Sequence, residues 1–312
     1  MTTVPMATPA KLSVTAIILA FNEEIHIGRC ISRIAPHVER VIIVDSFSTD
    51  RTVEIATSLG AEVVQHTFKH QAEQFQWALD TCNVTTDWIL RLDADEYLEQ
   101  GLIEVIRSRL PGVGTDISGL DFKLKVVFKG RWIRHGGYYT TILTRAWRTG
   151  IGHYEQRWMD EKIVLRSGRS ELINGGDLVD ESLKDIGWWT DKHNRYATRQ
   201  MVDFINREHA LFPIDSTVDR QAHAQARWKR FLRNRVFAAA PLYVRSVGYF
   251  VLRYVFKLGF LDGRQGFVFH TLQGFWYFML IDAKIDEARA YIKAHGVDAF
   301  RQHLITHHKI SL

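Results

Sequence analysis

The amino-acid sequence predicts an α/β fold, in which helices flank a mostly parallel sheet and a helical C-terminal extension follows. Two observations support this prediction. Short apolar segments rich in β-branched residues alternate with segments of helical periodicity over the first hundred residues. Helical spacing of apolar residues returns between residues 183 and 208. We therefore predict an α/β domain over residues 1–210 and a basic, aromatic helical extension over residues 211–312.

Four strands and three helices are predicted before residue 93. The strands are expected over residues 13–20, 40–44, 61–65 and 87–92, and the helices over 25–34, 50–59 and 71–81. Asp50 is a plausible N-cap for the second helix, and Gly60 ends it. Strands that alternate with helices at this spacing form right-handed βαβ units, so the sheet should be mostly parallel.

Polar residues follow three of these strands directly. Phe21-Asn22-Glu23 follows the first strand, Asp45 the second, and the acidic residues 93–96 the fourth. Ligands of open α/β sheets bind beyond the carboxyl ends of the strands, so these residues should meet in one crevice. The chain has neither G-x-G-x-x-G after the first strand nor G-x-x-x-x-G-K-[ST]. The phosphates of a nucleotide would then have to be held by a metal ion.

The segment WILRLDADEYL, residues 88–98, is the strongest candidate for that metal site. Alternate side chains of an extended segment share a face, so Asp93 and Asp95 should point the same way and Glu96 elsewhere. Two carboxylates can bind one Mg²⁺ or Mn²⁺ and leave positions open for phosphate oxygens. The alternative interpretation is a solvated acidic turn.

Several short segments, in this order along the chain, resemble a known family. AIILAFNEE, VIIVDSFSTDRTVEIA, QFQWAL and WILRLDADEYL together are similar to the N-terminal half of family 2 glycosyltransferases with the GT-A fold, closest to the lipopolysaccharide-core and exopolysaccharide type. FKGRWIRHGGYY (residues 128–139), WMDE (158–161) and KHNRYA (192–197) resemble weaker blocks of the same group. The resemblance therefore extends across most of the first two hundred residues.

The resemblance implies roles on the donor side. Asp45 would contact the base of a nucleotide-sugar donor, such as a UDP-sugar, with Asn22 and Glu23 beside it and Gln74 also on the donor side. Asp45 could instead be a turn residue. Asp93 would lie near the ribose or the metal, and would act with Asp95 as a metal-binding pair.

An inverting transfer also needs a general base for the acceptor hydroxyl. The resemblance points to Asp160 or Glu161, with Asp160 favoured, although a surface pair of acids would look the same in the sequence. Cations and aromatic residues are mixed in residues 128–139, which suits a saccharide or lipid-linked acceptor. A hairpin with a solvated basic face is the alternative for this segment.

The C-terminal part has an unusual distribution of charge. Residues 220–261 contain no Asp or Glu and nine cations interleaved with aromatics. These cations are Arg220, Arg227, Lys229, Arg230, Arg233, Arg235, Arg245, Arg253 and Lys257. Such a composition suits an anionic membrane surface, with a helical core as the alternative. We see no nucleic-acid motif and expect no nucleic-acid partner.

The sequence also predicts where the protein works. The apolar run 266–281 is short of the roughly 20 residues that span a bilayer. The first residues do not resemble a signal peptide, and the two cysteines show no C-x-x-C spacing. We expect a cytoplasmic protein, peripheral on the inner face of the cytoplasmic membrane. A nucleotidyltransferase and a non-catalytic scaffold with the same fold are the competing functions.

Overall fold

The computed structural model describes residues 10–154, 163–211, 240–308 and 310. The chain divides into two compact units. Unit 1 comprises Met1–Lys125, Thr140–Tyr154 and Leu165–Ser182, and unit 2 comprises Val126–Tyr139, Glu155–Val164 and Leu183–Leu312. The domain boundary at residue 210 stays a prediction.

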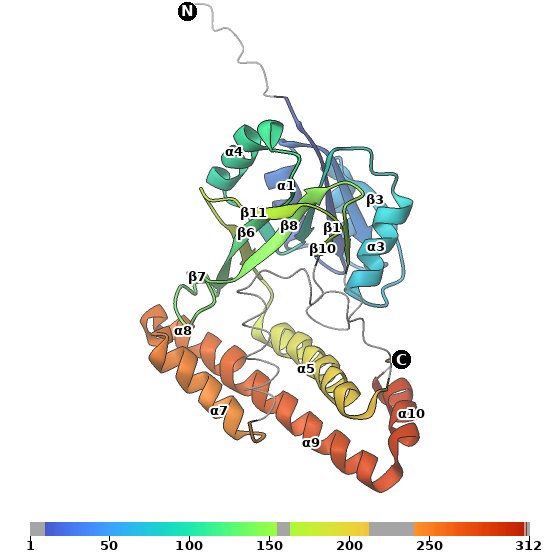
Figure 1. Ribbon diagram of the computed structural model, residues 1–312, viewed down its shortest axis with the longest axis vertical. Helices are drawn as coiled ribbons and strands as arrows, with labels where there is room; N and C mark the ends of the chain where they lie inside the picture. Colours follow the sequence, from blue (N-terminus) through green and yellow to red (C-terminus); the bar gives the residue numbers. More distant parts are fainter. Residues whose placement is uncertain (1–9, 155–162, 212–239, 309, 311–312) are drawn as a thin grey trace, which may run out of the picture. The chain divides into compact units, whose positions relative to one another are not determined.

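Unit 1 is built on one large sheet with strand order β3-β2-β1-β4-β8-β6-β12-β5 (Figure 1). The first four strands are parallel, as predicted, whereas β8 is antiparallel to both β4 and β6. The sheet is therefore mixed, with its parallel part in the segment before residue 93. The strands are β1 (Leu12–Ala20), β2 (Val38–Asp45), β3 (Glu62–Gln65), β4 (Trp88–Asp93), β5 (Glu96–Leu98), β6 (Ile117–Phe128), β8 (Ile142–Arg148), β11 (Arg169–Leu172, paired with β6) and β12 (Leu178–Glu181).

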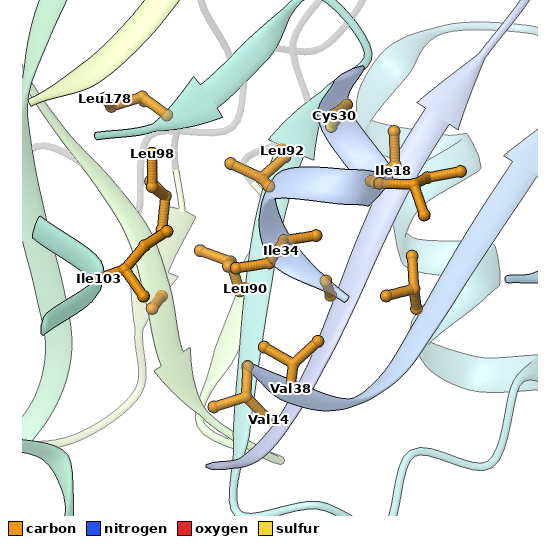
Figure 2. Close-up of a cluster of buried hydrophobic side chains, with 14 of the residues drawn as sticks. Val14, Ile18, Cys30, Ile34, Val38, Leu90, Leu92, Leu98, Ile103 and Leu178 are labelled. Atoms are coloured by element: carbon orange, nitrogen blue, oxygen red, sulfur yellow. The ribbon is translucent and has the colours of Figure 1, made fainter. Parts of the chain in front are cut away.

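Helices cover both faces of this sheet. Helices α1 (Ile27–Ile34), α2 (Thr52–Ser58) and α4 (Gln100–Arg109) contribute side chains to the main apolar core on one face (Figure 2). Helix α3 (Gln71–Thr81) lies on the other face, where Phe75 packs against Trp147 and Tyr154 with ring centroids 5.7 and 4.9 Å apart. The helix expected over residues 71–81 is confirmed. A short 3₁₀ turn, η1 (Leu110–Gly112), follows α4.

The second predicted helix begins later than expected. Helix α2 starts at Thr52 rather than at Asp50. The N-cap is Arg51 rather than the predicted Asp50, although the Asp50 carboxylate accepts a hydrogen bond from the Thr52 N–H of the first turn at 2.9 Å. Gly60 follows with φ of 78°, a conformation that ends helices and favours glycine.

Unit 2 is mostly helical. Its core joins α5 and α9, which run side by side (Figure 1), and its buried residues include Met201, Ile205 and Ile285. Among the described residues, no helix combines the length and apolarity needed to cross a bilayer. The remaining elements of the described residues are β7 (Arg131–Trp132, paired with β6), β9 (Gly152–Tyr154), β10 (Ile163–Leu165), α5 (Ile186–His209), α7 (Val244–Val251), η4 (Leu252–Phe256), η5 (Gly259–Asp262), α8 (Gly263–Phe269), η6 (His270–Trp276), α9 (Tyr277–His295) and α10 (Val297–His308).

Residues 127–132 form a hairpin at the start of the segment 128–139, as in the alternative interpretation, and the segment belongs to unit 2. Val127 pairs with Trp132 in an antiparallel ladder. The His135 backbone N–H donates to the Asp262 carboxylate at 2.9 Å. Gly136 has φ of 70°, and a Cβ there would lie 2.1 Å from the His270 ring. The glycine is therefore required by both its conformation and its close approach to this histidine.

Candidate active site at the carboxyl ends of the parallel strands

The strand register brings three polar turns to one edge of the sheet. In the parallel ladders, Ala20 of β1 lies opposite Asp45 of β2, and Leu19 lies opposite Asp93 of β4. The residues that follow the three strands therefore lie at the same end of adjacent strands. This confirms the predicted convergence and makes the edge the candidate site.

The turns after β1 and β2 are tied together by hydrogen bonds. The Asn22 N–H donates to Ser48 Oγ at 2.9 Å, and Asn22 Oδ1 accepts from the Thr49 N–H at 2.8 Å. The Glu23 N–H donates to Thr52 Oγ1 at 2.7 Å. Asn22 itself has φ of 54°, a left-handed conformation that asparagine tolerates better than most residues. The predicted donor-side turn is thus held in place by its neighbour.

Asp45 is fully buried and holds its own turn. Its Oδ2 accepts from the Ser48 N–H at 2.9 Å and from Gln65 Nε2 at 3.1 Å, and the Ser48 hydroxyl donates to Oδ1. Gln74 is also buried, and its Nε2 donates to Ser46 Oγ at 2.7 Å. These bonds give Asp45 the turn-forming role of the alternative interpretation, and the contact of Asp45 and Gln74 with a nucleotide stays a prediction.

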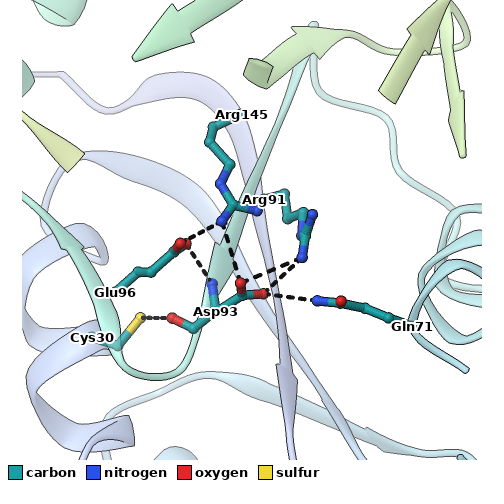
Figure 3. Close-up of polar contacts among 6 residues, drawn as sticks. All are labelled: Cys30, Gln71, Arg91, Asp93, Glu96 and Arg145. Carbon is teal, nitrogen blue, oxygen red and sulfur yellow. Dashed lines mark hydrogen bonds and ion pairs between the residues drawn. The ribbon is translucent and has the colours of Figure 1, made fainter. Parts of the chain in front are cut away.

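Asp93, the last residue of β4, lies between two buried guanidinium groups (Figure 3). Arg91 Nη2 is 3.0 Å from Asp93 Oδ1, and Arg145 Nη2 is 3.3 Å from Oδ2. Gln71 Nε2, from the first turn of α3, donates to Oδ1 at 3.2 Å. Because charge-assisted bonds are strong, the carboxylate of Asp93 is fixed in orientation and its charge is largely neutralised.

The expected geometry of the acidic segment is wrong in two respects. Strand β4 ends at Asp93, and Ala94-Asp95 form a turn, so the alternation of an extended segment does not apply to Asp93 and Asp95. Glu96 does not point elsewhere: its Oε2 accepts from the Asp93 N–H at 3.0 Å, and its other oxygen is paired with Arg145 (Figure 3). The turn folds back so that Glu96 opens β5 beside the end of β4.

Burial makes Glu96 an unusual carboxyl group. Only 3% of its surface is exposed, and this burial raises its pKa to about 8. The Arg145 guanidinium opposes the rise, while the negative charge of Asp93 adds to it. Glu96 and Arg145 thus form an enclosed hydrogen-bonded pair beside Asp93.

Arg29 of α1 holds the turn from the other side. Its guanidinium donates to the Asp95 carbonyl oxygen at 3.3 Å and to the Glu181 carbonyl oxygen at 2.6 Å. The Glu181 N–H also donates to the Asp95 carbonyl oxygen, at 3.1 Å. The backbone of the turn that presents Asp95 is therefore fixed by an arginine from a helix and by strand β12.

Sequence reasoning missed the arginines of this site. Arg91 lies two residues before Asp93 on the same strand, so the alternation of side chains could have placed it beside that carboxylate. Arg145 offers no such signal, because β8 joins β4 through antiparallel pairing of segments that are distant in sequence, residues 88–90 with residues 146–148. Asp160 and Glu161 lie outside the described residues, so their predicted role as base is untested.

The carboxylates can be compared with what a divalent cation needs. Within the part of the chain that the structure describes, no three His, Cys, Asp or Glu side chains are grouped so as to hold a metal by themselves. Mg²⁺ is usually bound through one or two carboxylates, with substrate phosphates and water completing its octahedron. Asp93 and Asp95 are one such pair of carboxylates in the sequence, and their joint binding of a metal stays a prediction.

The pattern described as Glycosyl transferase family 2 matches residues 15–172, which include every element of the candidate site up to β11. The chain belongs to this family. The mixed α/β sheet with flanking helices and a helical C-terminal region confirms the predicted GT-A class of fold for this family member. Family membership favours sugar transfer over the nucleotidyltransferase alternative.

Two curated relatives and one solved structure illustrate the similarity. An uncharacterized glycosyltransferase of Rickettsia prowazekii is 33% identical over 203 residues, 62% of this chain and 68% of the relative. The lipopolysaccharide core biosynthesis glycosyltransferase LpsC of Rhizobium meliloti is 34% identical over 193 residues, 60% of this chain and 70% of the relative. The glucosyl-3-phosphoglycerate synthase of Mycobacterium tuberculosis, in complex with Mn²⁺, UDP and glucosyl-3-phosphoglycerate, matches with 24% identity and a TM-score of 0.30, covering 36% of this chain and 44% of that one. The chain spans only 32–40% of the length of the first curated relatives that it matches.

Proposed function

We propose that this family 2 member transfers a sugar, with inversion, from a uridine diphosphate sugar to a lipid-linked or saccharide acceptor during lipopolysaccharide or exopolysaccharide synthesis. The observation that supports it most is the placement of Asp45, Asp93 and the Asp95 turn at one sheet edge. The similarity to LpsC of Rhizobium meliloti favours a lipopolysaccharide acceptor.

The base of the donor would bind at the turns after β1 and β2. Asp45 and Asn22 supply hydrogen-bonding groups there once the nucleotide rearranges their present contacts. Phe21 and Phe47 follow the same strands and are 55% and 52% exposed, so an aromatic face is available for stacking. Phe47 has φ of 60°, a strained conformation of the kind that collects at functional sites.

A divalent cation, Mg²⁺ or Mn²⁺, would be held by Asp95 with Asp93, and would neutralise the charge that develops on the leaving diphosphate. Arg91 and Arg145 fix the Asp93 carboxylate, so in our proposal Asp93 orients the donor side and Asp95 is the principal ligand. The enclosed Glu96–Arg145 pair keeps this arrangement rigid when the diphosphate enters.

The acceptor side rests on the sequence. We propose Asp160 as the general base that takes the proton of the acceptor hydroxyl, with Glu161 as the alternative. The enzyme would act on the cytoplasmic face of an anionic membrane, where nucleotide sugars and lipid-linked acceptors meet.

The deciding experiment incubates the full chain with labelled UDP-sugars and a membrane extract that contains acceptors, with Mn²⁺ or with a chelator. The proposal expects UDP release that requires both metal and acceptor. Donor binding without UDP release under any of these conditions would favour the scaffold. Release of pyrophosphate from a nucleoside triphosphate would favour a nucleotidyltransferase.

A further inference from the structure

Helix α7 has its apolar side chains on the outside. Val244, Val247 and Val251 are 65%, 47% and 36% exposed, and Val255 in the following π-helical turn is 48% exposed. These residues are three or four positions apart, so they form one stripe along the helix. Water-exposed helices of globular proteins show the opposite arrangement, with the apolar stripe facing the core.

The opposite side of α7 faces inward and carries buried polar residues at its start, while Tyr249 further along packs on Phe278 with ring centroids 4.5 Å apart. Arg245, only 6% exposed, donates through Nε to Asp282 of α9 at 2.7 Å. The Ser246 hydroxyl and the Tyr243 N–H donate to the other oxygen of Asp282, at 2.7 and 2.8 Å. Asp282 is itself 1% exposed. The helix is thus attached to unit 2 through an enclosed ionic network.

Arg253 repeats the same arrangement one turn beyond α7. It is 8% exposed, its Nε donates to the Gly136 carbonyl oxygen at 2.7 Å, and its guanidinium lies 3.5 Å from the centre of the Tyr138 ring. The expectation that Arg245 and Arg253 offer charge to a membrane surface is therefore wrong. Both cations are used inside unit 2, because buried partners hold them there.

The exposed stripe of α7 belongs to a larger apolar surface. We call it the α7 face, and Phe256, 73% exposed, is its most exposed residue. Lys257 and Arg264 are exposed cations within the same stretch of chain. The α7 face consists of Val244, Val247, Val251, Leu252, Val255, Phe256, Leu258, Phe260, Leu261 and Phe267, each at least 36% exposed.

We propose that the α7 face inserts into one leaflet of a lipid bilayer, so that the protein is anchored by apolar side chains rather than mainly by charge. An inside-out helix is stable in hydrocarbon, where exposed valine and phenylalanine side chains are solvated favourably and internal ion pairs remain dry. The helical stretch Val244–Phe256 is too short to cross a bilayer, which needs roughly 20 residues, so the face would lie in the membrane plane.

Charge favours lipid over a second copy of this chain as the occupant. Residues 240–261 contain no Asp or Glu, and Lys257 and Arg264 are exposed cations beside the apolar residues. Pairing two such stretches would bring like charges together, whereas anionic headgroups complement them. Lys257 and Arg264, exposed beside the apolar residues, are suited to reach those headgroups.

The test is co-sedimentation of the full chain with vesicles of phosphatidylcholine alone, at about 1 M salt, where the screening length is about 3 Å. The wild type should still bind, and the variant Val247→Gln/Phe256→Gln should bind on the order of tenfold more weakly. The matched control is Leu59→Gln/Ile305→Gln, whose residues are 40% and 44% exposed and are not part of the α7 face. The control should bind like the wild type.

A second measurement keeps the inference testable if the double variant does not fold. A polarity-sensitive fluorophore is attached to Val251→Cys or to Ile305→Cys, each in a Cys82→Ser background, since Cys30 is buried. Vesicles should shift the emission of the label at position 251 to shorter wavelength and leave the label at position 305 unchanged.

Three results would overturn the inference. Complete release of the wild type from vesicles at high salt would mean attachment by charge. Equal vesicle binding by the α7-face variant and its control would place the anchor elsewhere. A dimer in light scattering that dissociates in the α7-face variant, without vesicle binding, would make a second copy the occupant. The inference rests on the proposed function only in that a lipid-linked acceptor would explain why the enzyme binds a membrane. These experiments measure membrane binding and not sugar transfer. Either proposal can therefore fail without the other.

Discussion

Helices α1 and α7 have the same length and similar patterns but opposite orientations. Each has eight residues, with apolar residues at the first, fourth and eighth positions: Ile27, Cys30 and Ile34 in α1, and Val244, Val247 and Val251 in α7. The three residues of α1 are buried against the sheet, and those of α7 are exposed. Periodicity therefore identifies a helix and its two faces, but does not say which face is buried.

The difference follows from what each helix meets. Strands β1 and β4 offer α1 an apolar surface, so burying its isoleucines removes them from water (Figure 2). Helix α7 meets Asp282, a buried carboxylate whose charge must be compensated, and Arg245 and Ser246 compensate it. The valines then remain on the outer side. In unit 1 the apolar face of the helix supports the sheet that carries the proposed active site. In unit 2 the apolar face is exposed and is proposed to anchor the protein.

The largest effect should come from the inward polar side of α7. Arg245→Met leaves Asp282 charged and buried, so the free energy of unfolding should fall by about 3–5 kcal/mol in urea titrations. Arg51→Met removes an exposed partner of Glu54 and should leave the free energy of unfolding close to that of the wild type. An unchanged free energy of unfolding in the Arg245→Met variant would contradict the inward orientation of Arg245 on α7. It would then also contradict the contrast between α1 and α7.

The next effect concerns the turn that unit 1 presents at the sheet edge. Asp95→Asn removes a ligand charge without changing shape, so kcat with Mn²⁺ should fall at least about 10²-fold while the thermal midpoint is kept. Asp116→Asn, at an exposed aspartate paired with Arg169, is the matched control and should keep kcat. Unchanged turnover of Asp95→Asn at saturating Mn²⁺ would contradict the proposal that Asp95 is a metal ligand.

A smaller effect is expected at Asp45, which is remote from the bond that breaks. Asp45→Ala should raise the KM or Kd for the donor about tenfold and lower kcat less, because it removes binding shared by ground and transition states. Isothermal titration with UDP separates the two quantities. Loss of kcat with unchanged UDP affinity would mean that Asp45 serves only to hold its turn.

The smallest effect is a pH dependence assigned to unit 2. Burial lowers the pKa of His193 and of His270 to about 4, so both are neutral in the folded protein. The unfolded chain binds protons at these positions below about pH 6.5, so folding stability should decrease as the pH falls from 6.5 toward 4. His193→Phe keeps the aromatic stack on Trp189 and should reduce this loss by about 1 kcal/mol in urea titrations at pH 4.5 relative to pH 7. An equal loss in the variant would assign the dependence to other groups.

Local sequence patterns are sufficient to specify the parallel half of the sheet and the place of the site. Each βαβ unit is encoded locally, by apolar runs and by the spacing of helix α3, and parallel strands must end at one edge. That reasoning alone places Asn22, Asp45 and Asp93 at the same edge, where the ladders confirm them. The resemblance carried by the same segments identifies the family, because those segments hold the site.

The partners of the charged residues, in contrast, depend on the tertiary fold. The pairing of Arg145 with Glu96 depends on β8 joining β4 across 49 residues of sequence, and that of Arg245 with Asp282 on α7 meeting α9 across 37. The turn at Ala94-Asp95 likewise replaces a simple alternation of side chains, because β5 pairs with the distant strand β12. A local sequence pattern predicts the element in which a charged residue lies. Whether its charge can be buried depends on a partner from another part of the chain.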